Sequence, residues 1–497
     1  MFRSIPEAVF AHAAAAPGKL CLADETRSVT YREYAEEILK TAAALRSKGV
    51  GSDDKVLIEA SQTISFCAAA MAVQLLGGVF VPVERNCGLD KILRIASLSG
   101  AKLVITPKAL SEIPENAACM TASALIAEAA AAEPIECPEM PAAETMAELL
   151  FSTGTTGTEK GIAISHGNNV ALAGNVIEGV SILEDNIELI PSPLNHSHGL
   201  RRYYANMYAG ASVVLITGVM NVRMFFELMD RYRVNSIDLV PTALSVLLKL
   251  SRGQFGLYKD ILRYIQFGSA PLVAQDMQTI RSLLPDTRLY NFYGSTESGC
   301  IVIYDFNTDH PKDKCIGRPA CNARIIIVDE DRNEIASAPD NTGCIASFGP
   351  MNMMGYWQDP EETRRVMENG FIYSNDEAYF DEDGDIILLG RRGDVINTGG
   401  NKVSPSEIED AALKIEAVAD CGCIAVADPM KGQVPKLYVQ LKAGCTFDPI
   451  SLRNDLAARL EPYKVPAFIE AIDAIPRSFN GKILRRVLSE IHAKKNH

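Results

Sequence analysis

Short apolar runs separated by helix-length segments dominate the first part of the chain. The runs KVLIEA (55–60), GVFVPV (78–83), KLVIT (102–106) and ASVVLIT (211–217) are rich in β-branched residues. Such runs are typical of buried strands, and their alternation with helical segments is typical of βαβ units. The pattern therefore predicts α/β layers with largely parallel sheets.

The pattern changes in the last third of the chain. From about residue 315 to 390, short strands alternate with turn signals such as VDEDRNE and DEDGD, which predicts a β-rich part. A last segment with both helical and strand patterns follows. We predict a large N-terminal domain over residues 1–393, built of layered α/β subdomains plus the β-rich part, and a small α+β domain over residues 394–497.

The size and composition fit this division. The chain has 497 residues, of which 47% are hydrophobic, and this length predicts two to four domains with buried cores. The net charge of −14 argues against a nucleic-acid or anionic-membrane binder. Residues 395–497 carry slightly more Lys and Arg than Asp and Glu. The negative net charge therefore lies on residues 1–394.

Neither apolar segment near the N-terminus reads as a membrane span. Pro6, Glu7 and His12 interrupt the first segment, so we predict an amphipathic helix that ends at Pro17-Gly18. The stretch 67–83 contains a Gly-Gly turn, which predicts a helix followed by a strand. Twelve cysteines without framework spacing predict free thiols and a cytoplasmic protein.

A loop rich in glycine and threonine, STGTTGTEKG (152–161), follows the apolar run LLF. Backbone N–H groups, hydroxyls and one lysine at this density form a candidate phosphate site. The candidate residues are Thr153, Gly154, Thr155, Thr156, Gly157 and Lys160. The spacing is not that of a Walker loop, and a plain Gly/Thr turn is an equal alternative.

A second loop, NFYGSTESG (291–299), offers Thr296 and Glu297 to a magnesium-bound nucleotide and Tyr293 to a base. The alternative is an ordinary helix N-terminus.

Two further candidates lie towards the C-terminus. Asp376 and Arg391 flank a predicted hairpin turn at Asp383-Gly384, and such a pair can hold vicinal hydroxyls or form a plain salt bridge. The turn PRSFNGK presents Lys482, either as an ordinary surface lysine or as a charge delivered to a reacting group.

Taken in order, these four motifs resemble those of the AMP-forming acyl-CoA synthetase superfamily. The segments GSAPL (268–272), IGRP (316–319), MGYWQDPEET (354–363) and GGNKVSPSEIED (399–410) extend the resemblance over nearly the whole chain. It implies an enzyme that joins a small carboxylic acid to coenzyme A with ATP and Mg²⁺, through an acyl adenylate. It also implies a C-terminal domain that is mobile about a hinge at Asp394.

The resemblance assigns roles to individual positions. The phosphate loop holds the β- and γ-phosphates, Thr296 contacts the α-phosphate, Glu297 supports Mg²⁺, and Lys482 bridges the α-phosphate and the reacting carboxylate. The remaining ligands are Asp376 and Arg391 for the ribose, Gly399 and Gly400 for the pantetheine arm, and Gly268, Ser269, Ala270, Asn291, Phe292, Tyr293, Gly294 and Ser295 around the nucleotide.

Four departures from the family pattern occur, one of them covering two positions of the hinge segment. Glu159 replaces a proline, which should loosen the phosphate loop and add a negative charge beside it. Ser-Asn-Asp at 374–376 replaces Thr-Gly-Asp, and Cys344 replaces a glutamate. Gly393 and Asn397 stand where relatives often have lysines.

The acid pocket is implied by SPLNHSHGLRRYY (192–204). The resemblance makes His196 an aromatic gate and places His198, Arg202 and Ser298 in the pocket, while Ser197 argues against an amino acid substrate. Burying Arg202 is costly without an anion, so we predict a second acidic or polar group on the acid, as in dicarboxylates or aromatic acids. The alternative is that Arg201 and Arg202 pair with acidic residues of the protein.

Other functions remain as alternatives. The enzyme could load a carrier protein in place of free coenzyme A, although no carrier segment follows residue 497. A luciferase-type monooxygenase and a non-catalytic nucleotide-binding protein are the other two. The latter would have lost Lys482, Glu297 or Asp376, and all three are present. The oligomeric state is not specified by the sequence.

Overall fold

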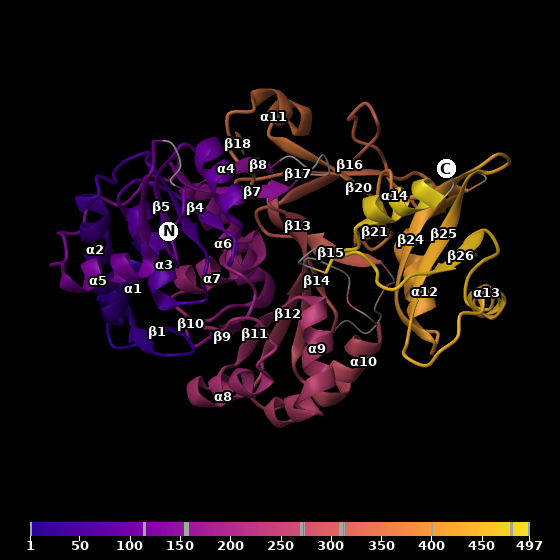
Figure 1. Ribbon diagram of the computed structural model, residues 1–497, viewed down its shortest axis with the longest axis horizontal. Helices are drawn as coiled ribbons and strands as arrows, with labels where there is room; N and C mark the ends of the chain where they lie inside the picture. Colours follow the sequence, from indigo (N-terminus) through magenta and orange to yellow (C-terminus); the bar gives the residue numbers. More distant parts are fainter. Residues whose placement is uncertain are drawn as a thin grey trace.

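The computed structural model describes residues 2–112, 116–153, 159–268, 272, 274–307, 312, 314–398, 401–477 and 481–495. The described residues form a large body and a smaller domain, which is orange and yellow at the right of Figure 1. Three sheets organise this part of the chain, two of them in the large body.

The first sheet has the strand order β18-β8-β7-β4-β3-β5-β6. These strands are β3 (Lys55–Glu59), β4 (Val79–Val83), β5 (Ala101–Thr106), β6 (Ala118–Thr121), β7 (Met146–Thr153), β8 (Glu159–Ser165) and β18 (Gly355–Tyr356). The pairs among β3 to β7 are parallel. Helices α2 (Tyr31–Ser47), α3 (Ile64–Leu75) and α5 (Ala122–Ala131) share a core with one face, and α4 (Leu89–Ser99) packs on the other.

The second sheet has the order β16-β17-β20-β21-β15-β14-β13-β12-β11-β9-β10-β1-β2, with β19 beside β20. Its α/β half contains β1 (Leu20–Ala23), β2 (Ser28–Thr30), β9 (Ile187–Ile190), β10 (Ser212–Leu215), β11 (Ser236–Leu239), β12 (Tyr264–Gly268), β13 (Arg288–Ser295) and β14 (Gly299–Asp305). Strands β1, β10, β9, β11, β12 and β13 pair in parallel, because each is separated from the next by a helical crossover.

Helices cover both faces of this half. Helices α1 (Ile5–Ala15), α6 (His166–Val180) and α7 (Ser197–Ala209) pack between the two sheets, in the core that also contains α2 and α3. The other face carries α8 (Val222–Tyr232), α9 (Pro241–Ser251), the 3₁₀ helix η1 (Gln254–Tyr258) and α10 (Ala274–Leu283). The two-sided cover explains why most residues of these strands are apolar on both faces of the sheet.

The β-rich half of the second sheet is antiparallel. It contains β15 (Cys315–Pro319), β16 (Arg324–Val328), β17 (Gly343–Phe348), β19 (Met367–Glu368), β20 (Phe371–Phe380) and β21 (Ile386–Arg391). The short helix α11 (Pro360–Val366) lies beside β18 and β19, and the pair β18–β8 joins this part to the first sheet.

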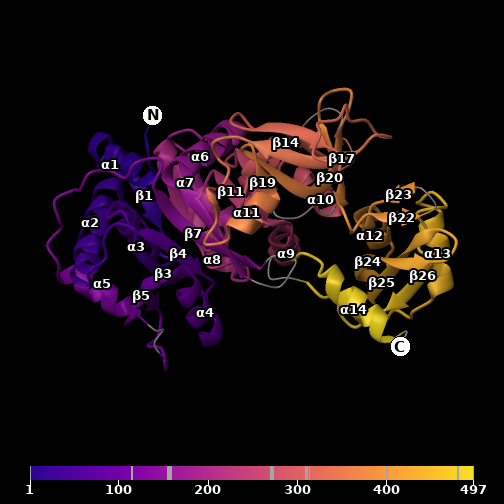
Figure 2. The ribbon, with the colours of Figure 1, turned by 90° about the horizontal axis from the view of Figure 1, so that it is seen from above.

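The C-terminal domain has its own sheet and cores, and Figure 2 shows it set apart from the body. The strands are β22 (Ile396–Thr398), β23 (Asn401–Val403), β24 (Val418–Asp428), β25 (Gly432–Leu441) and β26 (Phe468–Ala471). The helices are α12 (Pro405–Leu413), α13 (Pro449–Ala457) and α14 (Arg485–Lys495).

The structure confirms the predicted fold class. Helix α1 ends just before Pro17-Gly18, and the stretch 67–83 is the end of α3, a turn and β4. All twelve cysteines are free thiols. No helix among the described residues is long and apolar enough to cross a membrane.

Candidate active site

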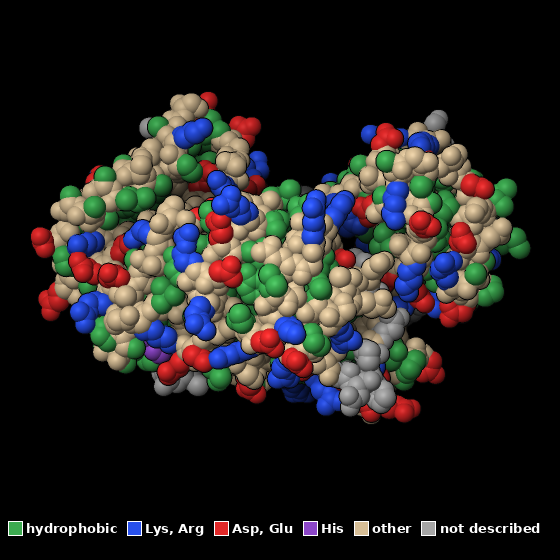
Figure 3. Space-filling view, turned by 90° about the horizontal axis from the view of Figure 1, so that it is seen from below, with side chains coloured by type: hydrophobic (Ala, Val, Ile, Leu, Met, Phe, Trp, Pro, Cys, Tyr) green, Lys and Arg blue, Asp and Glu red, His purple; other side chains and the backbone are tan. Residues whose placement is uncertain are grey.

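The predicted motifs meet at the carboxyl ends of the parallel strands in the second sheet. Strand β12 ends at Gly268, β13 ends at Ser295, and His196 immediately precedes α7. Open α/β sheets bind ligands at this edge. Figure 3 shows the surface hollowed between the large body and the C-terminal domain at the right.

Strands β7 and β8 form an antiparallel hairpin whose tip is the predicted phosphate loop. Thr153 ends β7, and Lys160 lies in β8 opposite Ser152. Gly154, Thr155, Thr156 and Gly157 lie outside the described residues, as do Ser269, Ala270, Gly399 and Gly400 from the other motifs.

The ammonium of Lys160 is paired within the protein. It forms an ion pair with Glu362 on α11 and lies 5.5 Å from the ring centre of Tyr356. Arg365 donates two hydrogen bonds of 2.6 Å to the same carboxylate. Arg365, with a smaller contribution from Lys160, lowers the pKa of Glu362 to about 2, so Glu362 is ionised at neutral pH. A phosphate that binds Lys160 therefore competes with Glu362.

The charge of Glu159 is also compensated. Arg94 on α4 donates hydrogen bonds of 2.6 and 3.1 Å to its carboxylate, which is 4% exposed, and Lys91 lies 3.8 Å away. Glu159 does add a carboxylate beside the phosphate loop, and Arg94 and Lys91 offset its charge. The substitution that removes the proline instead connects the base of the loop to α4.

Thr296 and Glu297 lie in the turn between β13 and β14, not at a helix N-terminus. The hydroxyls of Ser295 and Ser298 lie 3.1 Å apart, and each accepts a hydrogen bond from the other residue's backbone N–H. The hydroxyl of Tyr356 donates a 2.8 Å hydrogen bond to Glu297. Burial and then the Glu297 carboxylate raise the pKa of Tyr356, so Tyr356 remains a neutral donor that orients Glu297.

Asp376 and Arg391 face each other across the pair β20–β21, as the sequence predicts. Arg391 Nε lies 3.4 Å from Asp376 Oδ1, and the hydroxyl of Tyr293 donates a 2.5 Å hydrogen bond to Asp376 Oδ2. Burial and the Asp376 carboxylate raise the pKa of Tyr293 well above its ordinary value. The loop after β13 and the β20–β21 hairpin therefore form one connected group.

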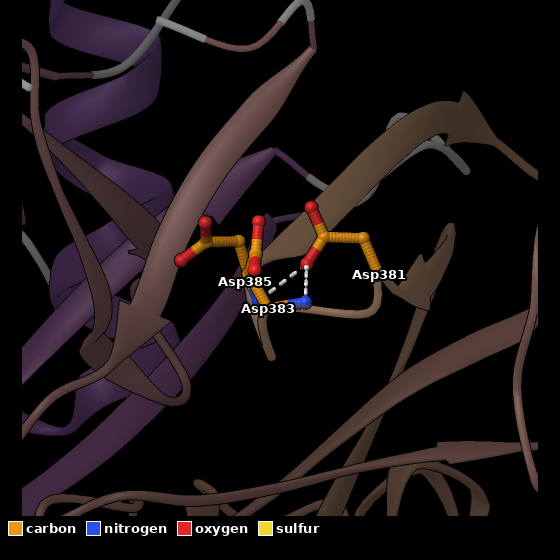
Figure 4. A group of neighbouring side chains, drawn as sticks. All are labelled: Asp381, Asp383 and Asp385. Atoms are coloured by element: carbon orange, nitrogen blue, oxygen red, sulfur yellow. Dashed lines mark hydrogen bonds between the residues drawn. The ribbon is translucent and has the colours of Figure 1, made fainter. Parts of the chain in front are cut away.

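The tip of this hairpin carries three aspartates whose carboxylates gather as in a metal site. Figure 4 shows Asp381, Asp383 and Asp385 turned toward one another, with Asp381 accepting hydrogen bonds from the backbone N–H groups of the other two. The ammonium of Lys312 contacts all three carboxylates at 2.6, 2.7 and 2.7 Å. The ammonium of Lys312 thus already lies among the three carboxylates, at the predicted turn Asp383-Gly384.

Lys482 lies in the cleft between the two domains. Burial and the neighbouring Arg391 lower its pKa, whereas Asp376 and Glu297 oppose the shift. All three neighbours belong to the large domain, so the C-terminal domain brings its lysine to the predicted ribose and magnesium residues.

The loop that carries Lys482 is positioned from both sides. Arg477 pairs with Asp420 through bonds of 2.6 and 2.9 Å and donates a 2.5 Å hydrogen bond to the carbonyl of Gly481. Gly481 has φ of +78°, and an added Cβ there would lie 2.6 Å from Thr242 at the start of α9. Only glycine allows this close approach without a shift.

Two histidines lie at the start of α7. His196 precedes the helix in an extended conformation, and burial, with Lys91 and His198, lowers its pKa against the influence of Glu84. His196 is therefore neutral at neutral pH. His198 Nε2 lies 2.7 Å from Asp238 Oδ1 on β11.

Arg202 does not depend on a substrate anion. Its side chain is 1% exposed, and it donates two hydrogen bonds of 2.6 Å to Glu188 on β9 and one of 3.0 Å to the hydroxyl of Tyr264. Arg201 likewise pairs with Glu148. The prediction that Arg202 needs an acidic substrate group is therefore wrong, and the alternative of pairing within the protein is correct.

The remaining predicted residues lie in β13 and the turn that follows it, except Asp394, which follows β21. Asn291 and Phe292 lie in β13, and an added Cβ at Gly294 would lie 1.7 Å from the carbonyl oxygen of Gly299. The hydroxyl of Ser298 accepts a hydrogen bond from the backbone N–H of Ser295 within its turn. The backbone N–H of Asp394 donates a 2.8 Å hydrogen bond to the carbonyl of Arg391, directly after β21.

The sequence reasoning did not identify four residues that contact the predicted ones. These are Glu362, Arg94, Glu188 and Asp238. Glu188 and Asp238 interrupt the apolar strands β9 and β11, and a charge in a buried strand is a readable signal. Glu362 and Arg94 lie on the surface helices α11 and α4, and a charge on a surface helix carries no such signal.

The sequence matches two family models. Residues 9–357 match the AMP-binding enzyme model, and residues 407–482 match the AMP-binding enzyme C-terminal domain.

The chain is also similar to curated proteins and to solved structures that are named as CoA ligases or synthetases. The chain is 28% identical to a 2-succinylbenzoate–CoA ligase from Geobacillus kaustophilus, with 96% of each chain covered. It is 28% identical to a feruloyl-CoA synthase from Amycolatopsis, covering 92% of this chain and 93% of that protein. An o-succinylbenzoate CoA synthetase from Bacillus subtilis, solved with its acyl-adenylate intermediate, superposes with a TM-score of 0.84 at 25% identity, with 97% of each chain covered.

Proposed function

The chain belongs to the AMP-binding enzyme family, and from this premise we propose that it is an ATP-dependent acid:CoA ligase. It converts a carboxylic acid, ATP and coenzyme A into an acyl-CoA, AMP and pyrophosphate. Free coenzyme A is the proposed acceptor, because the similar curated proteins are named as CoA ligases and synthases.

The position of Lys482 carries this proposal. A lysine of the C-terminal domain shares the cleft with Asp376, Arg391 and Glu297 of the large domain. Adenylate formation needs a positive charge beside the α-phosphate and the attacking carboxylate, where negative charge accumulates in the transition state. The arrangement supplies that charge at the point where the predicted ribose and magnesium residues meet.

The described residues suit a nucleotide at this edge. Asn291 Oδ1 is buried and has no hydrogen-bond partner among the described residues, so it is an available acceptor for the amino group of adenine. The proposed ribose ligands are Asp376 and Arg391. Glu297, oriented by Tyr356, is a hard oxygen ligand suited to Mg²⁺, which when bound neutralises phosphate oxygens.

The proposed chemistry proceeds in two displacements. An oxygen of the substrate carboxylate forms a bond to the α-phosphorus, and pyrophosphate leaves. The thiolate of coenzyme A then forms a bond to the acyl carbon, and AMP leaves. The intermediate is required because a bare carboxylate has no competent leaving group, whereas AMP is one. Lys482 holds the carboxylate and the α-phosphate together in the first displacement.

For the acid, we propose a class of compounds and not a single substrate. We retain the proposal that the acid is aromatic or dicarboxylic and carries a polar group. Arg202 is no longer assigned to bind that group. The similar ligases named for 2-succinylbenzoate and ferulate support an aromatic acid.

A panel assay tests the proposed function. Pyrophosphate and AMP release would be measured with ATP, Mg²⁺ and coenzyme A over mono- and dicarboxylic, aliphatic and aromatic acids. We expect release that depends on an added acid and an acyl-CoA product. ATP cleavage to ADP, or no acid-dependent release from any member, would contradict the proposal. Replacing coenzyme A with a phosphopantetheinylated carrier protein tests the alternative acceptor.

A further inference from the structure

The lysine at the base of the phosphate loop is held by a carboxylate from another element. The ammonium of Lys160 on β8 forms an ion pair with Glu362 on α11, and the two side chains are only 17% and 15% exposed. A phosphate group requires the positive charge of the same ammonium. Glu362 is therefore an anion of the protein that competes with a bound phosphate for Lys160.

The backbone fixes Glu362 beside β8. Tyr356 of β18 lies opposite Ile162 of β8, and its N–H donates a 2.9 Å hydrogen bond to the hydroxyl of Thr363 on α11. Asp359 caps α11 by accepting a 2.9 Å hydrogen bond from the N–H of Glu362. Figure 1 shows α11 beside β18. Contacts within the protein therefore place the carboxylate at the ammonium without any ligand.

Glu362 keeps a partner when Lys160 leaves. Arg365, one turn further along α11, donates a 2.6 Å hydrogen bond to each oxygen of the carboxylate. These are charge-assisted bonds, and they come from the same helix as Glu362. Lys160 can thus move to a phosphate without leaving the carboxylate uncompensated, which is the costly state for a largely buried charge.

The ring of Tyr356 connects Lys160 to the proposed magnesium residue. The ammonium of Lys160 lies 5.5 Å from the centre of this ring, and the hydroxyl of the same ring donates a 2.8 Å hydrogen bond to Glu297. One aromatic side chain therefore contacts both groups that are proposed to bind the phosphates of a magnesium nucleotide. An ammonium that leaves Glu362 is already beside these phosphates.

We propose that Glu362 is a positioning residue that holds Lys160 while the phosphate site is empty, releases it to the β- and γ-phosphates of ATP, and takes it back when pyrophosphate leaves. Because pyrophosphate must compete with Glu362, its binding is weakened and its release is favoured. This inference rests on the proposed ligase function and adds to it a residue that acts through Lys160.

The proposal predicts a variant that binds phosphate more tightly than the wild type. Glu362→Gln keeps the size of the side chain and removes the charge that competes for Lys160. We expect the Kd values for pyrophosphate and for ATP to fall by roughly two- to fivefold, the size expected for one partly exposed ion pair. Damage to the structure would weaken binding, so tighter binding is a result that a purely structural role does not give.

Calorimetric titration of the full-length protein measures both affinities without an acid substrate. The probes are ATP with Mg²⁺ and inorganic pyrophosphate with Mg²⁺. Glu361→Gln is the matched control, because Glu361 is the exposed neighbour on the same helix and its loss changes the net charge equally. Glu362→Ala removes the same charge if Glu362→Gln folds poorly, since alanine favours a helix. With an acid that is turned over, pyrophosphate should also inhibit Glu362→Gln at lower concentrations than the wild type.

A double variant tests whether the effect passes through the lysine. Lys160→Met should bind both probes more weakly than the wild type, and adding Glu362→Gln should change neither affinity further, because the two groups are coupled. Tighter binding that persists in the double variant would assign the effect to Arg365, freed from Glu362 to bind phosphate itself, and would overturn the inference.

The remaining outcomes distinguish the two proposals. Unchanged or weaker binding in the folded Glu362 variants overturns this inference and leaves the ligase function standing. An equal tightening in Glu361→Gln would be a general effect of charge and also overturns it. A wild-type protein that binds neither probe overturns both proposals. Tighter pyrophosphate binding in Glu362→Gln without turnover of any acid supports the role of Glu362 and overturns the ligase function alone.

Discussion

The pair of Arg202 and Glu188 shows what a buried charge requires at the scale of a residue. Arg202 donates two hydrogen bonds to Glu188, and Asn206 donates a third of 2.7 Å to the same carboxylate. Removing one member of a buried pair leaves the other uncompensated, which costs roughly 3–5 kcal/mol. We therefore expect Arg202→Leu to destabilise the protein by about this amount, measured by urea unfolding.

The same variant separates stability from specificity. In the remaining folded fraction, the order of preference among acids should be that of the wild type. The double variant Arg202→Leu, Glu188→Leu should recover much of the stability, because neither charge is then left alone. An Arg202→Leu protein of wild-type stability with an altered acid preference would contradict the structural role.

His166, the first residue of α6, predicts a pH dependence of stability. Both ring nitrogens are buried without partners among the described residues, and burial lowers the pKa to about 4. The unfolded chain takes up a proton near pH 6.5, which the folded chain resists, so stability is present above pH 6.5 and is lost as the pH falls towards 4. His166 should contribute a loss of about 2 kcal/mol between pH 7 and pH 5.

Unfolding by urea at these two pH values checks this expectation. The difference between the two free energies should be smaller by about 2 kcal/mol in His166→Phe than in the wild type. An identical difference in both proteins would show that His166 takes up its proton in the folded state.

At the scale of elements, the hairpin β7–β8 is connected to α4 through Glu159 and Arg94. Arg94 is half-exposed, so solvent screens the pair and its contribution to stability is small. The effect on phosphate binding should be larger, because Arg94→Ala leaves Glu159 beside the phosphate loop with only the more distant Lys91, at 3.8 Å, to offset its charge. We expect the KM for ATP to rise by roughly two- to fivefold, measured by pyrophosphate release.

A second change provides the control for this pair. Glu159→Gln alone should not raise the KM for ATP, and the double variant Arg94→Ala, Glu159→Gln should return it to the wild-type value. A rise that persists in the double variant would mean that Arg94 acts on the nucleotide independently of Glu159.

The elements also show how far the sequence could be interpreted. Strands, helices and the β20–β21 hairpin follow from local patterns, and the meeting of Asp376 with Arg391 follows from the hairpin itself. The partners of Arg202 and Lys160 lie on other elements, and their pairing depends on how those elements pack. Local pattern therefore predicts which residues are candidates, and tertiary packing decides which charges remain available to a ligand.

At the scale of the whole molecule, the net charge of −14 contrasts with the anionic ligands that are proposed. Local arrangement resolves the contrast, because Glu159 is paired with Arg94 and Glu362 with Arg365 and Lys160. Lys482 adds a further positive charge to the cleft from the C-terminal domain.

The relative position of the two domains is the central feature of this account. Contacts of Gly481 with Thr242 and of Lys482 with the large-domain cleft define an arrangement suited to adenylate formation. Lys482 should therefore serve the first displacement and not the second. Because its surroundings in the cleft lower its pKa below the ordinary lysine value, the ammonium is lost at a lower pH than in a free lysine, so adenylation should fall on the alkaline side.

The most direct test measures the two half-reactions separately in Lys482→Ala, with Lys431→Ala on an exposed turn of the same domain as the control. Acid-dependent exchange of pyrophosphate with ATP reports adenylation, and conversion of a supplied acyl adenylate with coenzyme A reports thioester formation. We predict that Lys482→Ala loses at least ~100-fold in the exchange and keeps thioester formation near the wild-type rate. An equal loss in both half-reactions, or an unchanged exchange, would contradict the account.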